Sequence, residues 1–126
     1  IRECLMTSYN GPAKIGKAVC MPGDIVMGTT SGILFIPAYL VEELVNSAEK
    51  SHAKDIFGFA MLEQGIYTAA EIDSTVWPEE MVDKMINFIE HDSSCEKYRG
   101  LDWSLEIDAA RGNQEAVDEL MKGYLV

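Results

Sequence analysis

The sequence has 126 residues and a mass of 14.0 kDa; 48% of its residues are hydrophobic and 25% are charged. This length suffices for one modest domain, and the composition excludes a wholly disordered or fibrous chain. Ten basic residues against twenty-one acidic ones give a formal net charge of −11. We therefore expect neither nucleic acid nor an anionic membrane surface as a partner, because both require clustered Lys and Arg. No apolar run approaches the roughly 20 residues of a membrane span.

The ends of the sequence and its cysteines bear on cellular location. The first residue is Ile1 rather than Met, so we expect the chain to be a piece of a longer protein, and no secretory signal pattern is found in it. Cys4, Cys20 and Cys95 are an odd, widely spaced set. Such a set favours reduced thiols over a disulfide framework, and thus a cytoplasmic protein.

The first third of the sequence predicts strands. Residues 13–19 form a candidate strand, and residues 21–24 (Met-Pro-Gly-Asp) form a turn by residue type. The apolar runs 24–28 and 33–36 predict a hairpin closed at Gly32. Strands that are apolar along nearly their whole length are usually covered on both faces, so this hairpin requires further layers.

A long helix is predicted to begin at Pro37 and to end near Gly58 or Gly65. Spacings of three and four residues predict an apolar face consisting of Val41, Val45, Ala48, His52 and Ile56. The opposite, polar face is predicted to consist of Glu42, Glu43, Asn46, Glu49 and Lys50. We expect Val45 to be buried against the hairpin.

The second half of the sequence predicts further helices. Residues 68–71 (Thr-Ala-Ala-Glu) match a capping box, and a helix is predicted over residues 78–90. Residues 91–100 are polar and predict a loop. Residues 101–108 alternate between apolar and polar, which predicts an extended segment. Asn113 can cap a last helix, whose predicted apolar face includes Ala116, Val117, Leu120, Met121, Tyr124 and Leu125.

One motif imitates a nucleotide-binding loop. Residues 11–18 match the phosphate-loop spacing except at Ala18, where the motif needs the hydroxyl of Ser or Thr to hold Mg²⁺. The following residues also predict a strand rather than the helix whose N-terminal amides would bind phosphate. We therefore reject nucleotide binding at this segment.

The remaining candidate residues favour structural roles. His52 is on the predicted apolar face, which favours a hydrogen-bonded core or interface histidine over a catalytic one. Asp55 is beside that face, and the pattern alone favours a solvated surface acid. Tyr98 and Trp103 are expected to be buried rather than to form an aromatic docking surface. No Cys or His pair has the spacing of a structural zinc site.

Three segments in order, residues 12–16, 19–26 and 32–37, carry a family resemblance. These segments resemble the C-terminal part of the RraA-like family. The shared pattern is a Pro followed by a strand, a Pro-Gly-Asp turn, a second strand, a Gly, and an apolar strand that ends at Pro. That family includes regulators of ribonuclease E activity and 4-hydroxy-4-methyl-2-oxoglutarate aldolase/oxaloacetate decarboxylase enzymes, and many members carry the older name "demethylmenaquinone methyltransferase". The resemblance covers residues 12–65, and residues 66–126 are similar to the C-terminal extension of longer members. Thr30-Ser31 stands where the family often has acidic residues.

The resemblance implies a fold and a site. The fold is α/β: the C-terminal part of a three-layer β/β/α swivelling-type domain (residues 1–65), followed by a helical extension (66–126). Family enzymes use an Arg-Asp pair and a glycine-rich loop to hold Mg²⁺ and a pyruvate-like enolate, whose negative charge the metal stabilises. Those motifs precede the matching segment, and no Arg-Asp dipeptide occurs in this sequence. By position, Asp55 matches the acid that the family contributes across a trimer interface, with Asp in place of Glu.

Two functions follow from the resemblance. In the first, the parent protein is a Mg²⁺-dependent lyase acting on a small 2-oxo acid, and this fragment alone binds no cofactor and is inactive. In the alternative, the parent is a non-catalytic regulator that binds a ribonuclease, a role that an acidic surface suits. In either case the uncovered hairpin predicts a homo-oligomer, with a trimer favoured, or association with the rest of its own chain.

Overall fold

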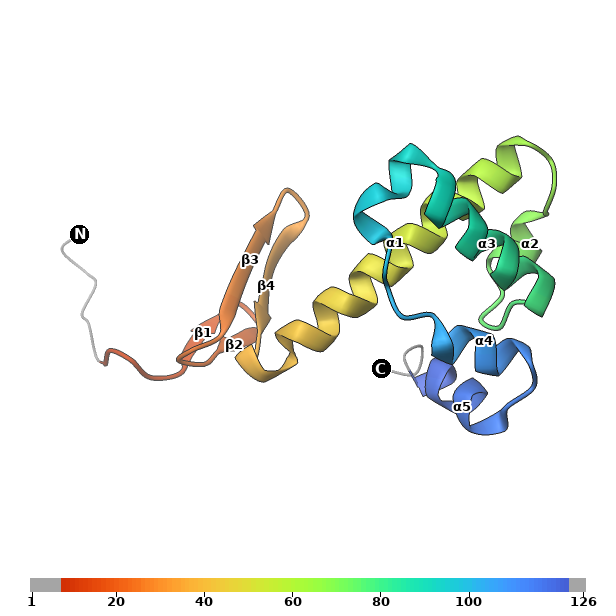
Figure 1. Ribbon diagram of the computed structural model, residues 1–126. Coiled ribbons are helices and arrows are strands. Elements are labelled where there is room, and N and C mark those ends of the chain that lie inside the picture. The colour runs from red at the N-terminus through yellow and green to blue at the C-terminus, as the bar shows by residue number, and fades with distance from the viewer. Residues whose placement is uncertain (1–7, 123–126) are drawn as a thin grey trace. The chain divides into compact units, whose positions relative to one another are not determined.

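The computed structural model describes residues 8–122 (Figure 1). The fold is mixed α/β, with two small antiparallel sheets followed by helices, which confirms the predicted class at this coarse level. Internal contacts divide the described chain into unit 1, residues 8–46, and unit 2, residues 47–122. The boundary between these two units lies within the long helix. It differs from the boundary expected from the sequence at residue 65, where the family-like segment ends and the helical extension begins.

Unit 1 begins with a hairpin where a single strand was predicted. Strands β1 (Ala13–Ile15) and β2 (Ala18–Cys20) pair antiparallel, with Lys14 opposite Val19. The chain reverses at Gly16, whose φ of +62° is a conformation that side chains with a Cβ adopt at a cost. The predicted strand over residues 13–19 is therefore wrong in its middle, because the glycine allows a tight turn there. The phosphate-loop-like segment forms this hairpin and no helix.

The second hairpin agrees with the prediction. Strand β3 (Ile25–Thr29) pairs antiparallel with β4 (Gly32–Ile36), and Met27 is opposite Leu34. The turn before it is fixed by Asp24, whose carboxylate accepts a hydrogen bond of 2.8 Å from the Met21 amide. The Pro-Gly-Asp sequence thus closes its own turn with a side chain.

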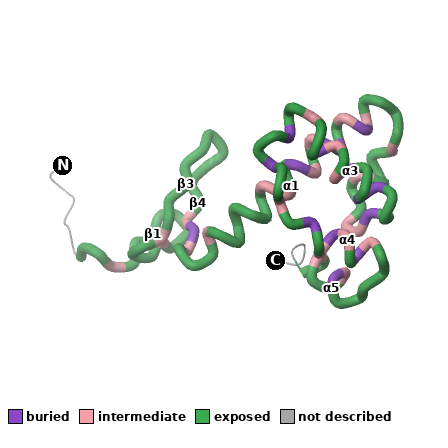
Figure 2. Tube along the Cα trace, in the orientation of Figure 1, coloured by how far each residue is buried: buried purple, intermediate pink, exposed green. Residues whose placement is uncertain are grey.

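Most apolar side chains of the second hairpin are exposed. On one face Ile25, Met27 and Leu34 are 44%, 48% and 47% exposed, and on the other Val26 and Ile33 are 56% and 63% exposed. Figure 2 shows the corresponding exposed stretch of the trace in green. Unit 1 therefore has little core of its own, since an isolated two-stranded hairpin buries too little surface for stability in water.

The long helix α1 (Val41–Glu63) follows a 3₁₀ turn, η1 (Ala38–Leu40), that Pro37 precedes. Val45 is 50% exposed, so the expected burial of Val45 against the hairpin is wrong. From Glu42 to Ala48 every residue of α1 is exposed. The apolar side chains of these turns, spaced three and four residues apart, therefore form a stripe that no part of unit 1 covers.

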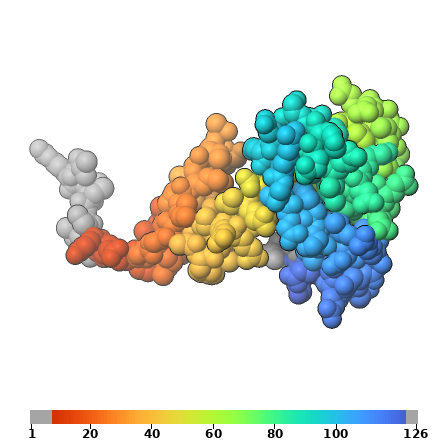
Figure 3. Space-filling model, viewed as in Figure 1, coloured from red at the N-terminus to blue at the C-terminus, as the bar shows by residue number. Residues whose placement is uncertain are grey.

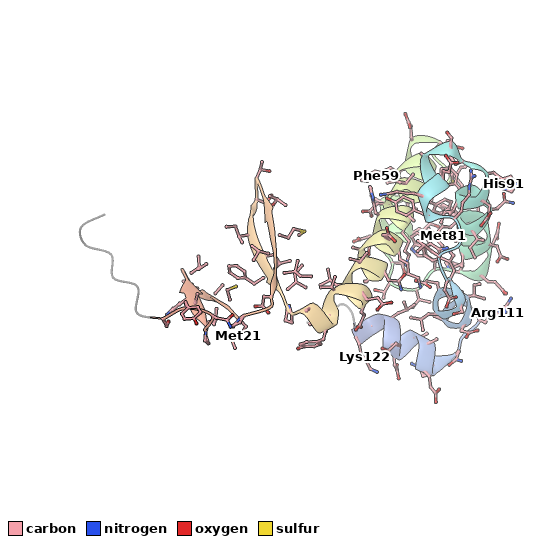
Figure 4. The ribbon with its side chains drawn as sticks, turned by 60° about the vertical axis from the view of Figure 1, so that its left-hand side comes forward. Met21, Phe59, Met81, His91, Arg111 and Lys122 are labelled. Carbon is pink, nitrogen blue, oxygen red and sulfur yellow. The ribbon has the colours of Figure 1, made fainter. Side chains whose placement is uncertain are left out.

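Unit 2 contains the rest of α1 and five shorter helices: α2 (Ala69–Ile72), α3 (Glu79–His91), the 3₁₀ helix η2 (Ser93–Tyr98), α4 (Ser104–Ala110) and α5 (Gln114–Lys122). Their core is one cluster: Ala53, Phe57, Met61, Trp77, Met81, Val82, Met85, Ile89, Cys95, Tyr98 and Trp103. Figure 4 shows Met81 among these helices, and Figure 3 shows the atoms of α3, α4 and α5 packed as a continuous surface. All members of this core belong to unit 2.

Within unit 2 the buried face of α1 is rotated from the predicted one. Ala53, Phe57 and Met61, four residues apart, are buried, whereas His52 is exposed and Ile56 is half-buried. Lys50, predicted on the polar face, is 16% exposed and points toward α4. The aromatic ring of Phe57 determines the rotation, because it contacts Tyr67, Trp77 and Phe88 with ring centroids 5.7–6.4 Å apart.

Two further predictions in the second half are corrected. Residues 91–100 include the 3₁₀ helix η2 rather than only a loop, and Asp92 caps it by accepting a hydrogen bond of 2.9 Å from the Ser94 amide. The extended segment predicted over residues 101–108 is the helix α4. The buried residues Glu106 and Ala109 of α4, and Trp103 immediately before it, are three positions apart, which is a helical spacing hidden beneath the alternation.

The other predicted helices agree with the structure. The capping box at Thr68–Glu71 is present, with both of its hydrogen bonds formed. Asn113 accepts hydrogen bonds from the first turn of α5. On α5 Ala116 is buried and Met121 is 43% exposed, while Tyr124 and Leu125 lie outside the described residues.

No helix in residues 8–122 is both long and apolar enough to cross a membrane.

Candidate functional site

The candidate site is a charge cluster inside unit 2, formed by Lys50 and Lys54 of α1 and Glu106 of α4. Glu106 is 8% exposed, and no other charged residue between residues 8 and 122 is as deeply buried. Burying a carboxylate is costly unless a cation and hydrogen bonds compensate for the lost water. The burial of Glu106 therefore requires a positive charge from a neighbouring element.

Lys50 provides that charge. Its Nζ lies 2.9 Å from Oε2 and 3.2 Å from Oε1 of Glu106, so one ammonium group bridges both carboxylate oxygens. The same Nζ lies 5.3 Å from the centroid of a Trp103 ring, within cation–π range. Trp103 immediately precedes α4, so the ion pair and the aromatic contact fix the same end of that helix.

Lys54 is one helical turn after Lys50 on α1. Its Nζ lies 4.7 Å from the centroid of a Trp77 ring, and the Trp77 indole donates a hydrogen bond of 3.1 Å to the Ile72 carbonyl. Lys54 and Glu106 also line a cavity of about 10 Å³, whose other walls are Thr75, Trp77, Val82, Met85 and Leu120. A cavity of this size holds about one water molecule and no substrate.

The electrostatics of Lys54 differ from those of a surface lysine. Burial lowers the pKa of its ammonium group, and the positive charge of Lys50 acts in the same direction. The carboxylate of Glu106 opposes these effects by raising the pKa. Desolvation is the largest of these three effects, so Lys54 loses its proton at a lower pH in the folded protein than in the unfolded chain.

The lowered pKa of Lys54 predicts how stability depends on pH. Between the lowered folded value and the unfolded value near 10.5, the unfolded chain binds more protons, so the contribution of Lys54 to the unfolding free energy rises with pH. We expect the stability of Lys54→Met relative to wild type to fall as pH rises from 7 to 10. Urea unfolding followed by tryptophan fluorescence measures this difference. Lys122→Met, at a side chain that is 70% exposed, should show no such trend, and an equal trend in both variants would contradict the assignment.

The charge cluster contains an amine with a lowered pKa and a carboxylate, the groups used for proton transfer. The cavity beside it, of about 10 Å³, is too small for a reactant. The geometry of the charge cluster instead connects α1 to α4. Sequence reasoning missed it because Lys50 falls on the predicted polar face and Glu106 in a segment predicted as extended. The available signal was that Glu106 lies between Trp103 and the apolar residues of α4, such as Ala109.

The structure does not bring the predicted site residue into a cluster. Asp55 is an exposed residue of α1, and the described residues group no three His, Cys, Asp or Glu side chains that could hold a metal ion. Mg²⁺ is usually held by carboxylates together with substrate oxygens and water. Asp55 alone could supply one such ligand, so the described residues do not fit a Mg²⁺ site by themselves.

The histidines, cysteines and aromatic residues have structural surroundings. The imidazole of His52 hydrogen-bonds the buried hydroxyl of Tyr98, consistent with the predicted interface role. Tyr98 and Trp103 are 1% and 7% exposed, which confirms their predicted burial. Cys20 and Cys95 are free thiols, as predicted, and Cys4 lies outside the described residues.

Comparisons of this chain with protein-family models, with curated proteins and with solved structures find no match.

Proposed function

We propose that this chain is the C-terminal part of an RraA-like protein, a Mg²⁺-dependent lyase that acts on a small 2-oxo acid. In this proposal, unit 1 completes the sheet of a three-layer β/β/α swivelling-type domain. The main catalytic residues belong to the parent protein upstream of the matching segment. Unit 2 is then the helical extension found in longer members of the family.

The observation that carries the proposal is the bare hairpin β3–β4. Both of its faces are apolar, yet Met27 and Leu34 on one face and Val26 on the other are about half exposed. Such a hairpin is a component of a larger layered sheet, because parallel or central strands are the ones that are apolar on both faces. The Pro-Gly-Asp turn, closed by Asp24, supports the resemblance at the level of local geometry.

The proposal assigns no chemistry to the described residues except at Asp55. This acid on α1 would assist the reaction from a neighbouring subunit, the role implied by its position relative to the family motif. The described residues do not by themselves fit a Mg²⁺ site, so in this proposal the ligands of the metal belong to the upstream part of the parent protein.

Activity measurements test this division of roles. We expect the purified 126-residue chain, supplied with Mg²⁺ and oxaloacetate, to release no more pyruvate than Mg²⁺ alone does. We expect the complete parent protein to decarboxylate oxaloacetate, and Asp55→Ala in the parent to reduce kcat. Turnover by the isolated chain would contradict the assignment of the catalytic residues, and an inactive parent would contradict the lyase proposal.

The charge distribution favours a protein-binding regulator as the second candidate. Unit 2, taken over residues 47–126, has seven basic and seventeen acidic residues, a net charge of −10, whereas residues 1–46 have three and four. Several of its cations are engaged within the unit; for example, Arg111 pairs with Glu79 at 2.7 Å and Lys122 with Glu119 at 2.6 Å. A parent that lacks lyase activity but inhibits ribonuclease E in a salt-dependent manner would establish this candidate instead.

Self-association of the purified chain provides a separate test. We expect sedimentation equilibrium at micromolar concentration to show species larger than 14.0 kDa, with a trimer favoured by the family resemblance, because the bare hairpin pairs with other copies. The double variant Met27→Lys/Leu34→Lys places two charges on one face and should shift the equilibrium toward monomer. Lys substitutions at Glu42 and Glu43, which also reduce the negative charge but lie on α1, serve as the control. A wild-type chain that sediments only at 14.0 kDa would contradict the expectation.

A further inference from the structure

One asparagine of unit 1 has a backbone conformation that residues with a side chain rarely adopt. Asn10 has a φ of +51°, and glycines are the only other described residues with a positive φ. Residues 8–12 belong to no helix or strand, and Asn10 is exposed to solvent. The peptide group between Asn10 and Gly11 is therefore not held by a helical or sheet hydrogen bond, and water reaches it.

The residue after Asn10 is the one that shields its own amide nitrogen least. Gly11 has no Cβ, and beyond its chain neighbours no described residue lies within 4 Å of the place where a Cβ would stand. The Gly11 nitrogen is separated from the side-chain carbonyl carbon Cγ of Asn10 by the carbonyl carbon, Cα and Cβ of Asn10. A bond between this nitrogen and Cγ therefore closes a five-membered ring, and the reaction is intramolecular.

We propose that the Asn10–Gly11 peptide is a site of spontaneous deamidation, at which unit 1 acquires a negative charge without an enzyme. The Gly11 nitrogen attacks Cγ of Asn10, a succinimide ring forms, and the bond between Cγ and Nδ2 breaks. Nδ2 leaves as ammonia and takes with it the proton that the Gly11 amide loses. Water then adds to one of the two ring carbonyl carbons and opens the ring, which leaves a carboxylate.

The two directions of ring opening give two products. Addition of water at Cγ leaves an ordinary aspartate at position 10. Addition at the main-chain carbonyl carbon leaves an isoaspartate, whose main chain passes through Cβ and Cγ and is longer by one methylene group. Either product makes the formal net charge of −11 more negative by one. The isoaspartate also presents a free carboxylate three residues before β1, and such a group is the substrate of isoaspartyl carboxyl methyltransferases that use S-adenosylmethionine.

The other three asparagines of the chain are held where this reaction is hindered. Asn46 and Asn87 are inside α1 and α3, where the amide nitrogens that follow them donate helical hydrogen bonds and the backbone is fixed. The side chain of Asn113 accepts hydrogen bonds from two amides of the first turn of α5. Ser, Phe and Gln follow these asparagines, so each attacking nitrogen is also crowded by a Cβ. These three residues are internal controls for Asn10.

The experiment incubates the full chain at pH 8 and at pH 5 and follows it by peptide mapping with mass spectrometry. We expect the peptide that contains Asn10 to gain the mass difference between an amide and a carboxylic acid, relative to a sample that is not incubated. Conversion should be faster at pH 8, because the attacking nitrogen must lose its proton. Incubation with an isoaspartyl methyltransferase and S-adenosylmethionine should add a methyl group to the converted peptide. Over the same period we expect no conversion at Asn46, Asn87 and Asn113.

Two variants test the mechanism. Gly11→Ala places a Cβ beside the attacking nitrogen, and the fold has room for it because the space is open and the φ of Gly11 is not positive. We expect it to slow conversion about tenfold, which corresponds to a barrier higher by about 1.4 kcal/mol. Asn10→Gln keeps an amide but needs a larger ring, and should stay unconverted.

Three results would overturn the proposal. The first is that Asn10 is converted no faster than the three control asparagines. The second is that Gly11→Ala reacts at the wild-type rate, since the attacking nitrogen would then not be that of Gly11. The third is that the converted peptide accepts no methyl group, since a succinimide opens in both directions.

Discussion

Phe57→Ala is expected to destabilise unit 2 by about 4 kcal/mol, the usual cost of removing a fully buried phenyl ring. Phe57 is 0% exposed and contacts the rings of Tyr67, Trp77 and Phe88, which come from three different segments of the chain. Its removal leaves a cavity that these rings can fill only in part. Urea unfolding followed by tryptophan fluorescence measures the loss.

Phe59→Ala is the matched control for this prediction. Phe59 belongs to the same helix two residues later, but it is 70% exposed and lies at the outside of the helical unit (Figure 4). We expect its substitution to change the unfolding free energy by less than about 0.5 kcal/mol. Equal losses at the two positions would show that α1 does not present the face described here to the core.

Lys50→Met is expected to destabilise unit 2 by about 3 kcal/mol, because it removes the cation that bridges both oxygens of the buried Glu106. Lys54 remains nearby and lessens the loss, so we place it at the lower end of the range for a broken buried pair. Thermal or urea unfolding at pH 7 measures the change.

A double substitution separates the ion pair from its packing. In Lys50→Met/Glu106→Leu, no charge is left unpaired, and apolar side chains fill most of the same volume. We expect this variant to recover most of the stability lost in Lys50→Met, as buried ion pairs replaced by apolar groups often do. A double variant as unstable as Lys50→Met would show that the aromatic contact of Lys50 with Trp103 dominates instead.

The elements that sequence reasoning predicted correctly are those with local causes. The hairpin β3–β4, the capping box at Thr68 and the cap at Asn113 each depend on residues within a few positions of one another. The first hairpin was missed because Gly16 is compatible with both a continuous strand and a tight turn. The pairing of residues 13–15 with residues 18–20 selects the turn.

The orientation of α1 and the identity of α4 depend on distant residues, which is why they were predicted incorrectly. Two faces of α1 have helical apolar spacing, and the choice between them is made by rings more than ten residues away around Phe57. The alternation in residues 101–108 has the period of a strand, yet Glu106 needs Lys50, fifty-six residues earlier, to be buried. For the same reason the charge cluster could not be predicted, whereas the proposed role of Asp55 comes from resemblance alone.

The core cluster of unit 2 contains no side chain from residues 8–46 of unit 1. Substitutions in the hairpins alter association with other segments, and substitutions in the helical core alter its own folding. Because the core cluster of unit 2 contains no residue of unit 1, the free-energy effects of substitutions in the hairpins and in this core should add. The hairpins and the helical core can therefore accumulate substitutions at different rates. The rate in the hairpins is limited by the segments with which they associate, and the rate in the core by its own packing.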